Sequence, residues 1–206
     1  MVLRRSRGFL IVLSGPSGAG KNTIVGEVLG RVPDLRYSIS ASTRPPRPGE
    51  VDGVNYFFLS EEEFEQRVKS GDFLEWATVY GHRYGTPRKY IEKMTASGQD
   101  VILDIDIQGA MKIKKTWEDA VFVFLLPPSL SELEKRLILR GSDTEEVVRH
   151  RLSCAREELE AVFDYDYVIV NDDKEKAVSA LMNIIYAERC RVKRCECREF
   201  IDDLRR

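Results

Sequence analysis

An eight-residue stretch near the N-terminus, Gly-Pro-Ser-Gly-Ala-Gly-Lys-Asn at positions 15–22, constrains the fold more than any other feature of the sequence. It matches the phosphate-binding loop pattern G-x-x-x-x-G-K. The apolar segment Phe9–Leu13 precedes it and is predicted to be a strand, and Asn22–Leu29 follows as a predicted helix that ends before Pro33. Glycines let the backbone amides turn toward an anion, and the helix that begins near Lys21 presents its positive end to the same anion.

A glycine turn that merely joins a strand to a helix is the alternative interpretation of this loop. The complete match between a strand and a helix favours phosphate binding, with Lys21 as the positive charge for β- and γ-phosphates. The residues expected to bind the nucleotide phosphates are Gly15, Pro16, Ser17, Gly18, Ala19, Gly20, Lys21, Asn22 and Thr23.

One position departs from the usual pattern of such loops. Asn22 stands where a Ser or Thr hydroxyl ordinarily binds Mg²⁺. An amide oxygen also ligates Mg²⁺, but it lies further from the backbone. Because the glycines and Lys21 are present, the departure concerns the metal contact and the catalytic rate more than nucleotide binding.

Two carboxylates accompany the predicted strand Val101–Ile105. Asp104 lies near its end and Asp106 lies two residues further on, so the period of two in a strand predicts that both face the same side. Ligands gather at the carboxyl ends of the strands in open parallel sheets. Asp104 is therefore a candidate to hold Mg²⁺ or to orient a cationic side chain, although a strand-end cap is the ordinary role of such a residue.

The pattern of apolar runs and helix signals predicts an α/β fold. Val121–Leu126 and Tyr167–Val170 are further predicted strands, and Thr144–Val162 and Lys174–Arg191 are predicted helices. Strands that alternate with helices indicate a parallel sheet with helices on both faces. Capping boxes are predicted at Ser60–Glu63, Ser129–Glu132 and Ser142–Glu145.

The composition excludes several classes of protein. The 206 residues carry 32 Lys and Arg against 34 Asp and Glu, and this net charge of −2 argues against a general nucleic-acid-binding protein. No apolar run is long enough to span a membrane, and the absence of a targeting segment predicts a cytoplasmic protein. The four cysteines and two histidines lack the spacing of common zinc sites, which favours free thiols.

Several blocks of residues resemble the guanylate kinase family, whose members transfer a phosphoryl group from ATP to GMP. The blocks follow the order of the family from about Phe9 to about Glu188. The most specific blocks are Thr-Arg-Pro-Pro-Arg-Pro-Gly-Glu at 43–50, Phe-Leu-Glu-Trp-Ala at 73–77 and Asp-Ile-Asp-Ile-Gln-Gly at 104–109. The resemblance also includes the phosphate loop and the segments 52–58, 84–86 and 170–173.

The resemblance implies roles for the Pro- and Tyr-rich segment 37–90. Arg44 and Arg47 would grip the GMP phosphate, and Tyr56 and Tyr84 would add hydroxyl contacts to it. The residues implied to read the guanine base are Ser40, Glu75 and Thr86, and Asp104 and Asp106 are expected beside the same acceptor. A carboxylate accepts the N1–H and N2–H₂ groups of guanine, and adenine would leave it unpaired.

The resemblance further implies that Arg136, Arg140 and Arg151 belong to a lid and its flanks and offset the charge of the transferring phosphate. Together with Lys21, Arg44 and Asp104 they form the predicted catalytic set. Asn171 and Asp172 match the region that contacts the adenine of ATP. Without the resemblance, the arginines would pass as solvated charges and Asn171–Asp173 as a turn.

The sequence thus predicts an α/β P-loop kinase with a core at about 1–37, 91–127 and 164–206, a GMP-binding lobe at 38–90 and a lid at 128–163. Its expected ligands are ATP with Mg²⁺ and GMP, and its expected state is a monomer or a homodimer without nucleic-acid or membrane partners. A P-loop kinase of another phosphorylated acceptor, such as a ribose bisphosphate, is one alternative. A guanylate-kinase-like binding module with weakened catalysis is the other, and Asn22 is the feature that supports it.

Overall fold

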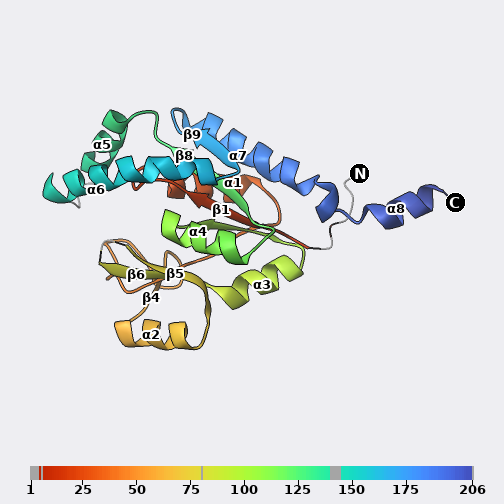
Figure 1. Ribbon diagram of the computed structural model, residues 1–206, viewed down its shortest axis with the longest axis horizontal. Coiled ribbons are helices and arrows are strands. Elements are labelled where there is room, and N and C mark those ends of the chain that lie inside the picture. Colours follow the sequence, from red (N-terminus) through yellow and green to blue (C-terminus); the bar gives the residue numbers. More distant parts are fainter. Residues whose placement is uncertain (1–4, 6, 80, 140–144, 206) are drawn as a thin grey trace.

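A five-stranded parallel sheet forms the centre of the computed structural model, which describes residue 5 and residues 7–79, 81–139 and 145–205 (Figure 1). The strands lie in the order β2-β7-β1-β8-β9, and each neighbouring pair is parallel. Their bounds are β1 Leu10–Ser14, β2 Leu35–Tyr37, β7 Asp100–Asp104, β8 Val121–Leu126 and β9 Tyr167–Val170.

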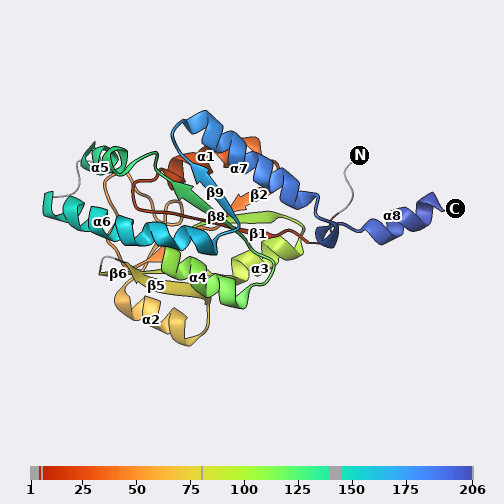
Figure 2. The same cartoon turned by 45° about the horizontal axis from the view of Figure 1, so that its top comes forward.

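Helices cover both faces of this sheet, and the sequence of β1 shows why. Four helices belong to the core: α1 Lys21–Arg31, α3 Arg88–Ala96, α4 Ile107–Thr116 and α7 Lys174–Arg189. Ile11 and Leu13 pack with α1 and α7 on one face, whereas Leu10 and Val12 pack with α3 and α4 on the other (Figure 2). All four side chains are fully buried, as expected for a strand covered on both faces. The predicted three-layer α/β class is confirmed.

The predicted core elements agree closely with the observed ones. β8 and β9 have the predicted bounds, β1 begins one residue later than predicted and β7 one residue earlier. The predicted helix Lys174–Arg191 ends two residues earlier, at Arg189. β2 was not predicted, because a strand of three residues with one buried side chain, Leu35, has no detectable period.

A second, four-stranded sheet lies within the segment predicted as an acceptor-binding lobe. Its strands are β3 Ala41–Ser42, β4 Phe57–Phe58, β5 Phe73–Val79 and β6 His82–Pro87, in the order β4-β3-β6-β5. Helix α2 (Glu61–Lys69) covers it through Phe64, which packs on Phe73 with ring centroids 4.6 Å apart. This small hydrophobic cluster is separate from the two clusters of the core.

Two of the predicted capping boxes lie in the described residues. Ser60 and Glu63 form the complete box at the start of α2, since each side chain accepts from the backbone amide of the other. Ser129 Oγ accepts from the amide of Glu132 at 3.1 Å, but the Glu132 carboxylate accepts from Arg136 Nε instead of completing the box.

The segment predicted as a lid contains α5 (Leu130–Leu139) and α6 (Glu145–Glu158). The predicted continuous helix Thr144–Val162 is wrong at its C-terminal end, because the α-helix stops at Glu158 and gives way to the 3₁₀ helix η1 (Leu159–Asp164). The tighter winding of η1 brings the next residue, Tyr165, to the sheet, where its ring packs edge-on against Phe124 with centroids 4.9 Å apart. The predicted site residue Arg140 and the predicted capping residue Ser142 lie outside the described residues.

The C-terminal residues leave the core after α7. They form the 3₁₀ helix η2 (Val192–Arg194) and then α8 (Cys197–Leu204), which projects away from the rest of the molecule (Figures 1 and 2). No helix in the part of the chain that the structure describes is both long and apolar enough to cross a membrane.

Candidate active site

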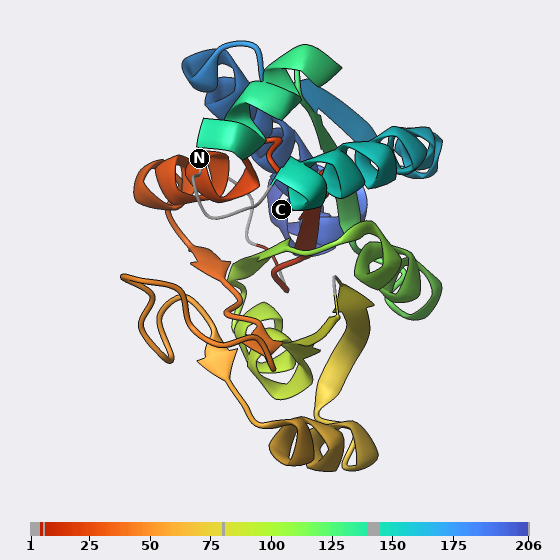
Figure 3. The ribbon, with the colours of Figure 1, turned by 90° about the vertical axis from the view of Figure 1, so that its left-hand side faces the viewer.

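A cavity of about 1270 Å³ lies where the phosphate loop, the four-stranded sheet and α6 meet. Figure 3 views the molecule from this side, with α5 and α6 at the top and the four-stranded sheet at the bottom. The carboxyl ends of β1 and β7 open into the cavity, as expected for ligand sites of open parallel sheets. The cavity therefore brings together residues from the three parts of the sequence that were predicted to form one site.

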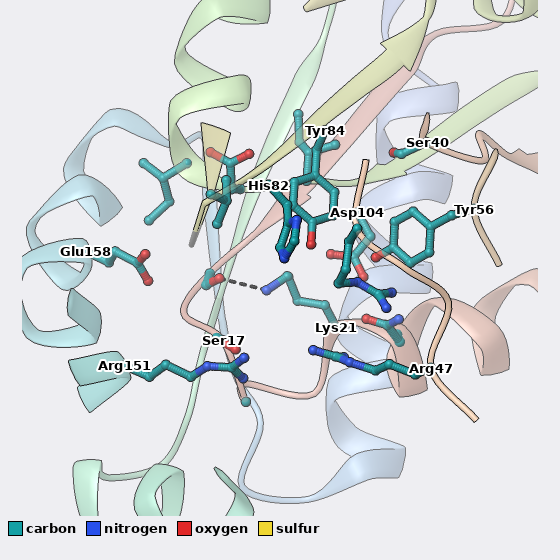
Figure 4. A pocket seen from close by; sticks show the side chains of 18 of the residues that line it. Ser17, Lys21, Ser40, Arg47, Tyr56, His82, Tyr84, Asp104, Arg151 and Glu158 are labelled. Carbon is teal, nitrogen blue, oxygen red and sulfur yellow. Dashed lines mark hydrogen bonds between the residues drawn. The ribbon is translucent and has the colours of Figure 1, made fainter. Parts of the chain in front are cut away.

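The phosphate loop has the backbone conformation that its glycines allow. Gly15, Gly18 and Gly20 have φ values of 147°, 96° and 99°, which side chains disfavour. Lys21 Nζ donates to the carbonyl oxygens of Gly15 (2.8 Å) and Pro16 (3.3 Å), so the ammonium lies over the loop (Figure 4). Gly20 caps α1 without a side chain, and this leaves the first amides of the helix available to an anion in the cavity.

The two predicted metal ligands line this cavity. Asn22 is exposed in the first turn of α1. Asp104 is the last residue of β7 (Figure 4). Burial, together with the negative charge of Asp104, raises the pKa of Tyr56 to about 12 and also raises the pKa of Tyr37. Thr23 is turned away and lines a separate, shallow groove along α1.

A cluster of arginine and tyrosine side chains lines the side of the cavity opposite α6. The Arg44 guanidinium donates to both carboxylate oxygens of Glu50 at 2.9 Å and lies 5.4 Å from the centroid of the Tyr56 ring. Tyr56 in turn meets Tyr84 edge-on, with centroids 6.0 Å apart. Burial tends to raise the pKa of Glu50, but the amide of Arg47 and the guanidinium of Arg44 hold it below its usual value.

Glu75 is the buried acid of the site. It lies on β5 directly opposite Thr86 of β6, only 7% of its surface is exposed, and Thr86 Oγ1 donates to its carboxylate at 2.5 Å. Burial raises the pKa of Glu75 to about 7, with the charge of Asp106 acting in the same direction against the hydrogen bond from Thr86 and the charge of Lys112. Ser40 lines the same cavity as Glu75.

Asp106 does not lie on a strand, so the predicted shared strand face of Asp104 and Asp106 is wrong. β7 ends at Asp104, and Asp106 is the N-cap of α4, where its Oδ1 accepts from the amides of Gln108 (2.8 Å) and Gly109 (3.2 Å). Both carboxylates still line the cavity, because the helix begins directly at the end of the strand.

The predicted lid arginines occupy different places. Arg151 on α6 lines the cavity and is buried. Arg136 on α5 instead donates to the carbonyls of Ala19 (3.4 Å) and Asn171 (3.2 Å), and thereby joins the phosphate loop to the turn after β9. Asn171 Nδ2 also donates to Ala19 at 2.7 Å, whereas Asp172 is exposed and accepts from the adjacent amide of Asp173.

Among the titratable residues that line the cavity, the sequence analysis did not predict four: Glu50, His82, His150 and Glu158. Glu158 follows Arg151 by two helical turns, so the spacing of seven residues puts both on one face of α6 and was a usable signal. Burial raises the pKa of Glu158 although the charge of Lys21 lowers it. The two histidines had no signal, because they are distant in the sequence and only the fold places both of them at the cavity.

Comparison with known proteins agrees with this geometry. The family model described as "Guanylate kinase" matches residues 7–188. The chain belongs to the guanylate kinase family. Relatives named guanylate kinase occur in Caldanaerobacter subterraneus subsp. tengcongensis (52% identity; 92% of each chain) and Symbiobacterium thermophilum (53%; 92% of this chain and 90% of the other). A crystal structure of guanylate kinase from Anaplasma phagocytophilum superposes with a TM-score of 0.82 at 36% identity, covering 96% of this chain and 95% of the other.

Family membership confirms the resemblance that the sequence blocks indicated. The matched residues include the phosphate loop, the four-stranded sheet, α6 and α7. The match ends at Glu188, within the last turn of α7, so η2 and α8 lie outside the part of the chain that the guanylate kinase model describes.

Proposed function

We propose that this protein is a nucleoside monophosphate kinase that transfers the γ-phosphoryl group of ATP to GMP and forms ADP and GDP. The observation that carries the proposal is the buried carboxylate of Glu75, placed in the same cavity as the phosphate loop. A phosphate loop alone is compatible with many acceptors. A buried acid beside it selects an acceptor that brings its own hydrogen-bond donors.

Guanine supplies those donors. Its N1–H and N2–H₂ groups pair with the two oxygens of Glu75, while Ser40 and Thr86 provide hydroxyls near the same base. Adenine has neither donor at these positions, so AMP would leave a buried carboxylate unpaired. Asp106, which lines the cavity near Glu75, adds a second acceptor for the amino group.

The arginine and tyrosine cluster receives the GMP phosphate. Arg44 Nη2 donates to both oxygens of the Glu50 carboxylate while Nη1 donates to the Pro45 carbonyl, so this guanidinium already binds anionic oxygen, and a phosphate offers the same acceptors. Arg47, Tyr56 and Tyr84 line the same wall and contribute further donors. The attacking phosphate oxygen carries negative charge near neutral pH, so no general base is required.

The phosphate loop receives ATP. The first amides of α1 and the Lys21 ammonium bind its β- and γ-phosphates, and Arg151 approaches from the lid. Arg136 and Asn171 hold the loop against the turn after β9, next to Asp172, where the adenine is expected. Closure of the lid and the acceptor lobe around both substrates excludes water and aligns the acceptor oxygen with the γ-phosphorus.

The donor atoms of the cavity fit Mg²⁺. Asn22 and Asp104 offer an amide oxygen and a carboxylate beside Lys21, and hard oxygen ligands of this kind are the ones that Mg²⁺ takes. These two residues would hold the ion together with the nucleotide phosphates. When bound, it neutralises part of the charge on the transferring group.

The test of the proposal is ADP formation by the purified protein with Mg·ATP, with GMP, AMP or a ribose bisphosphate as acceptor. Rapid ADP formation with GMP alone is the expected result. Comparable rates with AMP would contradict the role of Glu75, and a preference for the sugar phosphate would support the alternative kinase. We expect the enzyme to act in the cytoplasm, as a monomer or a homodimer.

Asn22 has its own test. Asn22→Ser places a short hydroxyl beside the phosphates and should raise kcat by roughly tenfold. This magnitude is expected because substitutions that alter the support of a metal site change activity by about that factor. Thr23→Ser is the matched control, because Thr23 lies outside the cavity and the rate should not change. ATP binding without turnover in both the parent protein and Asn22→Ser would identify a binding module.

A further inference from the structure

The first turn of α4 lies directly against the Glu75 carboxylate. Gly109 is the third residue of this helix, and a Cβ atom built on it would lie 2.6 Å from Glu75 Oε2 and 2.9 Å from Glu75 Cδ. Real Cβ atoms do not approach other heavy atoms so closely. The carboxylate therefore occupies space that is free only because residue 109 has no side chain.

The Glu75 carboxylate, rather than helix α4, is the partner that would have to move to relieve this contact. The Glu75 carboxylate is buried and held on its other side by Thr86 Oγ1 at 2.5 Å. Helix α4 is fixed by the cap from Asp106 and by the fully buried Ala110 and Ile113, which pack on the sheet. A methyl group at position 109 would thus displace the carboxylate itself.

The contact also sets the electrostatic surroundings of the carboxylate. The N-terminal turn of a helix carries partial positive charge, but the Asp106 carboxylate caps this turn of α4, and burial together with the charge of Asp106 raises the pKa of Glu75 to about 7. This close approach brings the Glu75 carboxylate to the first turn of α4 while it still lines the cavity. Gly109 thereby determines both the position of the carboxylate and part of its surroundings.

We propose that Gly109 is a positioning residue for acceptor recognition: the missing side chain lets Glu75 stand against α4 in the place from which it pairs with guanine. The inference rests on the proposed function, because it assigns Glu75 to the acceptor base. Gly109 acts through Glu75 and makes no contact of its own with the substrate.

The test is Gly109→Ala, with kinetics and binding measured separately for the two substrates. Alanine is a better helix former than glycine, which offsets part of the cost of the overlap, so we expect a folded protein. The dissociation constant and KM for GMP should rise about tenfold, because guanine then meets a displaced acceptor. The KM for ATP should stay within about twofold, since the phosphate loop is untouched, and the preference for GMP over AMP should fall.

Gly30→Ala is the matched control. Gly30 also lies in a helix, α1, but a Cβ atom there meets nothing within 4 Å. This variant makes the same chemical change in a helix without the contact. It should therefore leave the preference for GMP over AMP unchanged.

Making the same substitution in a Glu75→Asp variant distinguishes an effect of Gly109 on the position of the carboxylate from a general effect on helix α4. Glu75→Asp withdraws the carboxylate by one methylene group, so a methyl at position 109 no longer meets it. Adding Gly109→Ala to Glu75→Asp should then change the KM for GMP by less than about twofold, which is the non-additivity expected of two residues in contact. An effect as large as in the parent protein would show that Gly109 acts through the helix and would overturn the inference.

The remaining outcomes are also decisive. Wild-type selectivity in Gly109→Ala, or equal losses for ATP and GMP, would overturn the inference while the proposed function stands. A parent protein that neither binds nor phosphorylates GMP would overturn the proposed function itself. Calorimetric titration of GMP and AMP into the parent protein distinguishes these cases before any variant is made.

Discussion

At the scale of single residues, the site depends on how the fold alters the properties of ordinary side chains. Glu75 is the clearest case, because burial raises its pKa to about 7 while Thr86 and the first turn of α4 hold it in place. The acid is therefore close to half-protonated at neutral pH. The proposed recognition of guanine through N1–H and N2–H₂ requires the ionised form, so the protonation state of this one residue should control acceptor affinity.

The first prediction at this scale concerns pH. As the pH falls through about 7, free Glu75 takes up a proton, and the KM for GMP should rise about tenfold between about pH 8 and about pH 6. Glu75→Gln should remove this part of the dependence and leave only the part due to the GMP phosphate. Equal pH profiles for the parent protein and Glu75→Gln would contradict the prediction.

The same pKa predicts an effect on stability. The pKa of Glu75 in the folded protein lies above its usual value of 4.5, so the folded state binds this proton more tightly than the unfolded state. The resulting contribution to the free energy of unfolding is complete below about pH 4.5 and is lost as the pH rises through about 7. Glu75→Gln should therefore raise the free energy of unfolding at about pH 8, by up to roughly 3 kcal/mol, and much less at about pH 5. Urea unfolding at both pH values measures this, and a loss of stability at both would contradict it.

The sequence predicted many of the residues that line the cavity but not their surroundings. The phosphate loop, Arg44 and Glu75 were found through motifs, whose spacing is local. The burial of Glu75 depends on contacts with Thr86 and Gly109, which are 11 and 34 positions away along the chain. No local pattern reports such contacts, and the same reason explains why His82 and His150 were missed.

At the scale of elements, long periodic segments were predictable and short ones were not. β8 has the predicted bounds because six consecutive apolar residues need no partner to be recognised as a buried strand. β3 and β4 have two residues each and exist only through their pairing in the folded lobe. Asp106 was misplaced because the period of the strand was extended past its end, whereas an Asp before an apolar helical segment is also a typical N-cap.

The complete capping box of α2 gives the prediction at this scale. Ser60→Ala removes the acceptor for the amide of Glu63 and should lower the free energy of unfolding by about 1 kcal/mol. Glu63→Gln keeps an acceptor for the Ser60 amide and should cost less. No described residue of α2 lines the cavity, so kcat should be unchanged, and a variant with normal stability but impaired kcat would contradict this reasoning.

At the scale of the whole molecule, the chain beyond the family match divides into a part that the core needs and a part that it does not. Asp100 has a fully buried carboxylate at the start of β7, and Arg5 (2.6 Å) and Arg189 (2.7 Å) both pair with it. Glu188 is likewise buried, and Arg194 pairs with it at 3.0 Å while its guanidinium lies 4.0 Å from the centroid of the Phe9 ring. These pairs were not predicted, because Asp100 lies far along the chain from Arg5 and Arg189, and the short spacing of Glu188 and Arg194 does not by itself predict burial.

Two truncations should therefore differ sharply. Ending the chain after Glu196 removes α8, which projects from the molecule, and should shift the melting temperature by no more than about 2 °C. Ending it after Glu188 also removes Arg189 and Arg194, leaves Asp100 with Arg5 alone and Glu188 without its cations, and should lower the free energy of unfolding by about 3–5 kcal/mol. No described residue beyond Glu158 lines the cavity, so the variant that ends after Glu196 should keep its kcat. Equal losses of stability in both truncations would show that α8, rather than the buried ion pairs, fastens the C-terminal residues to the core.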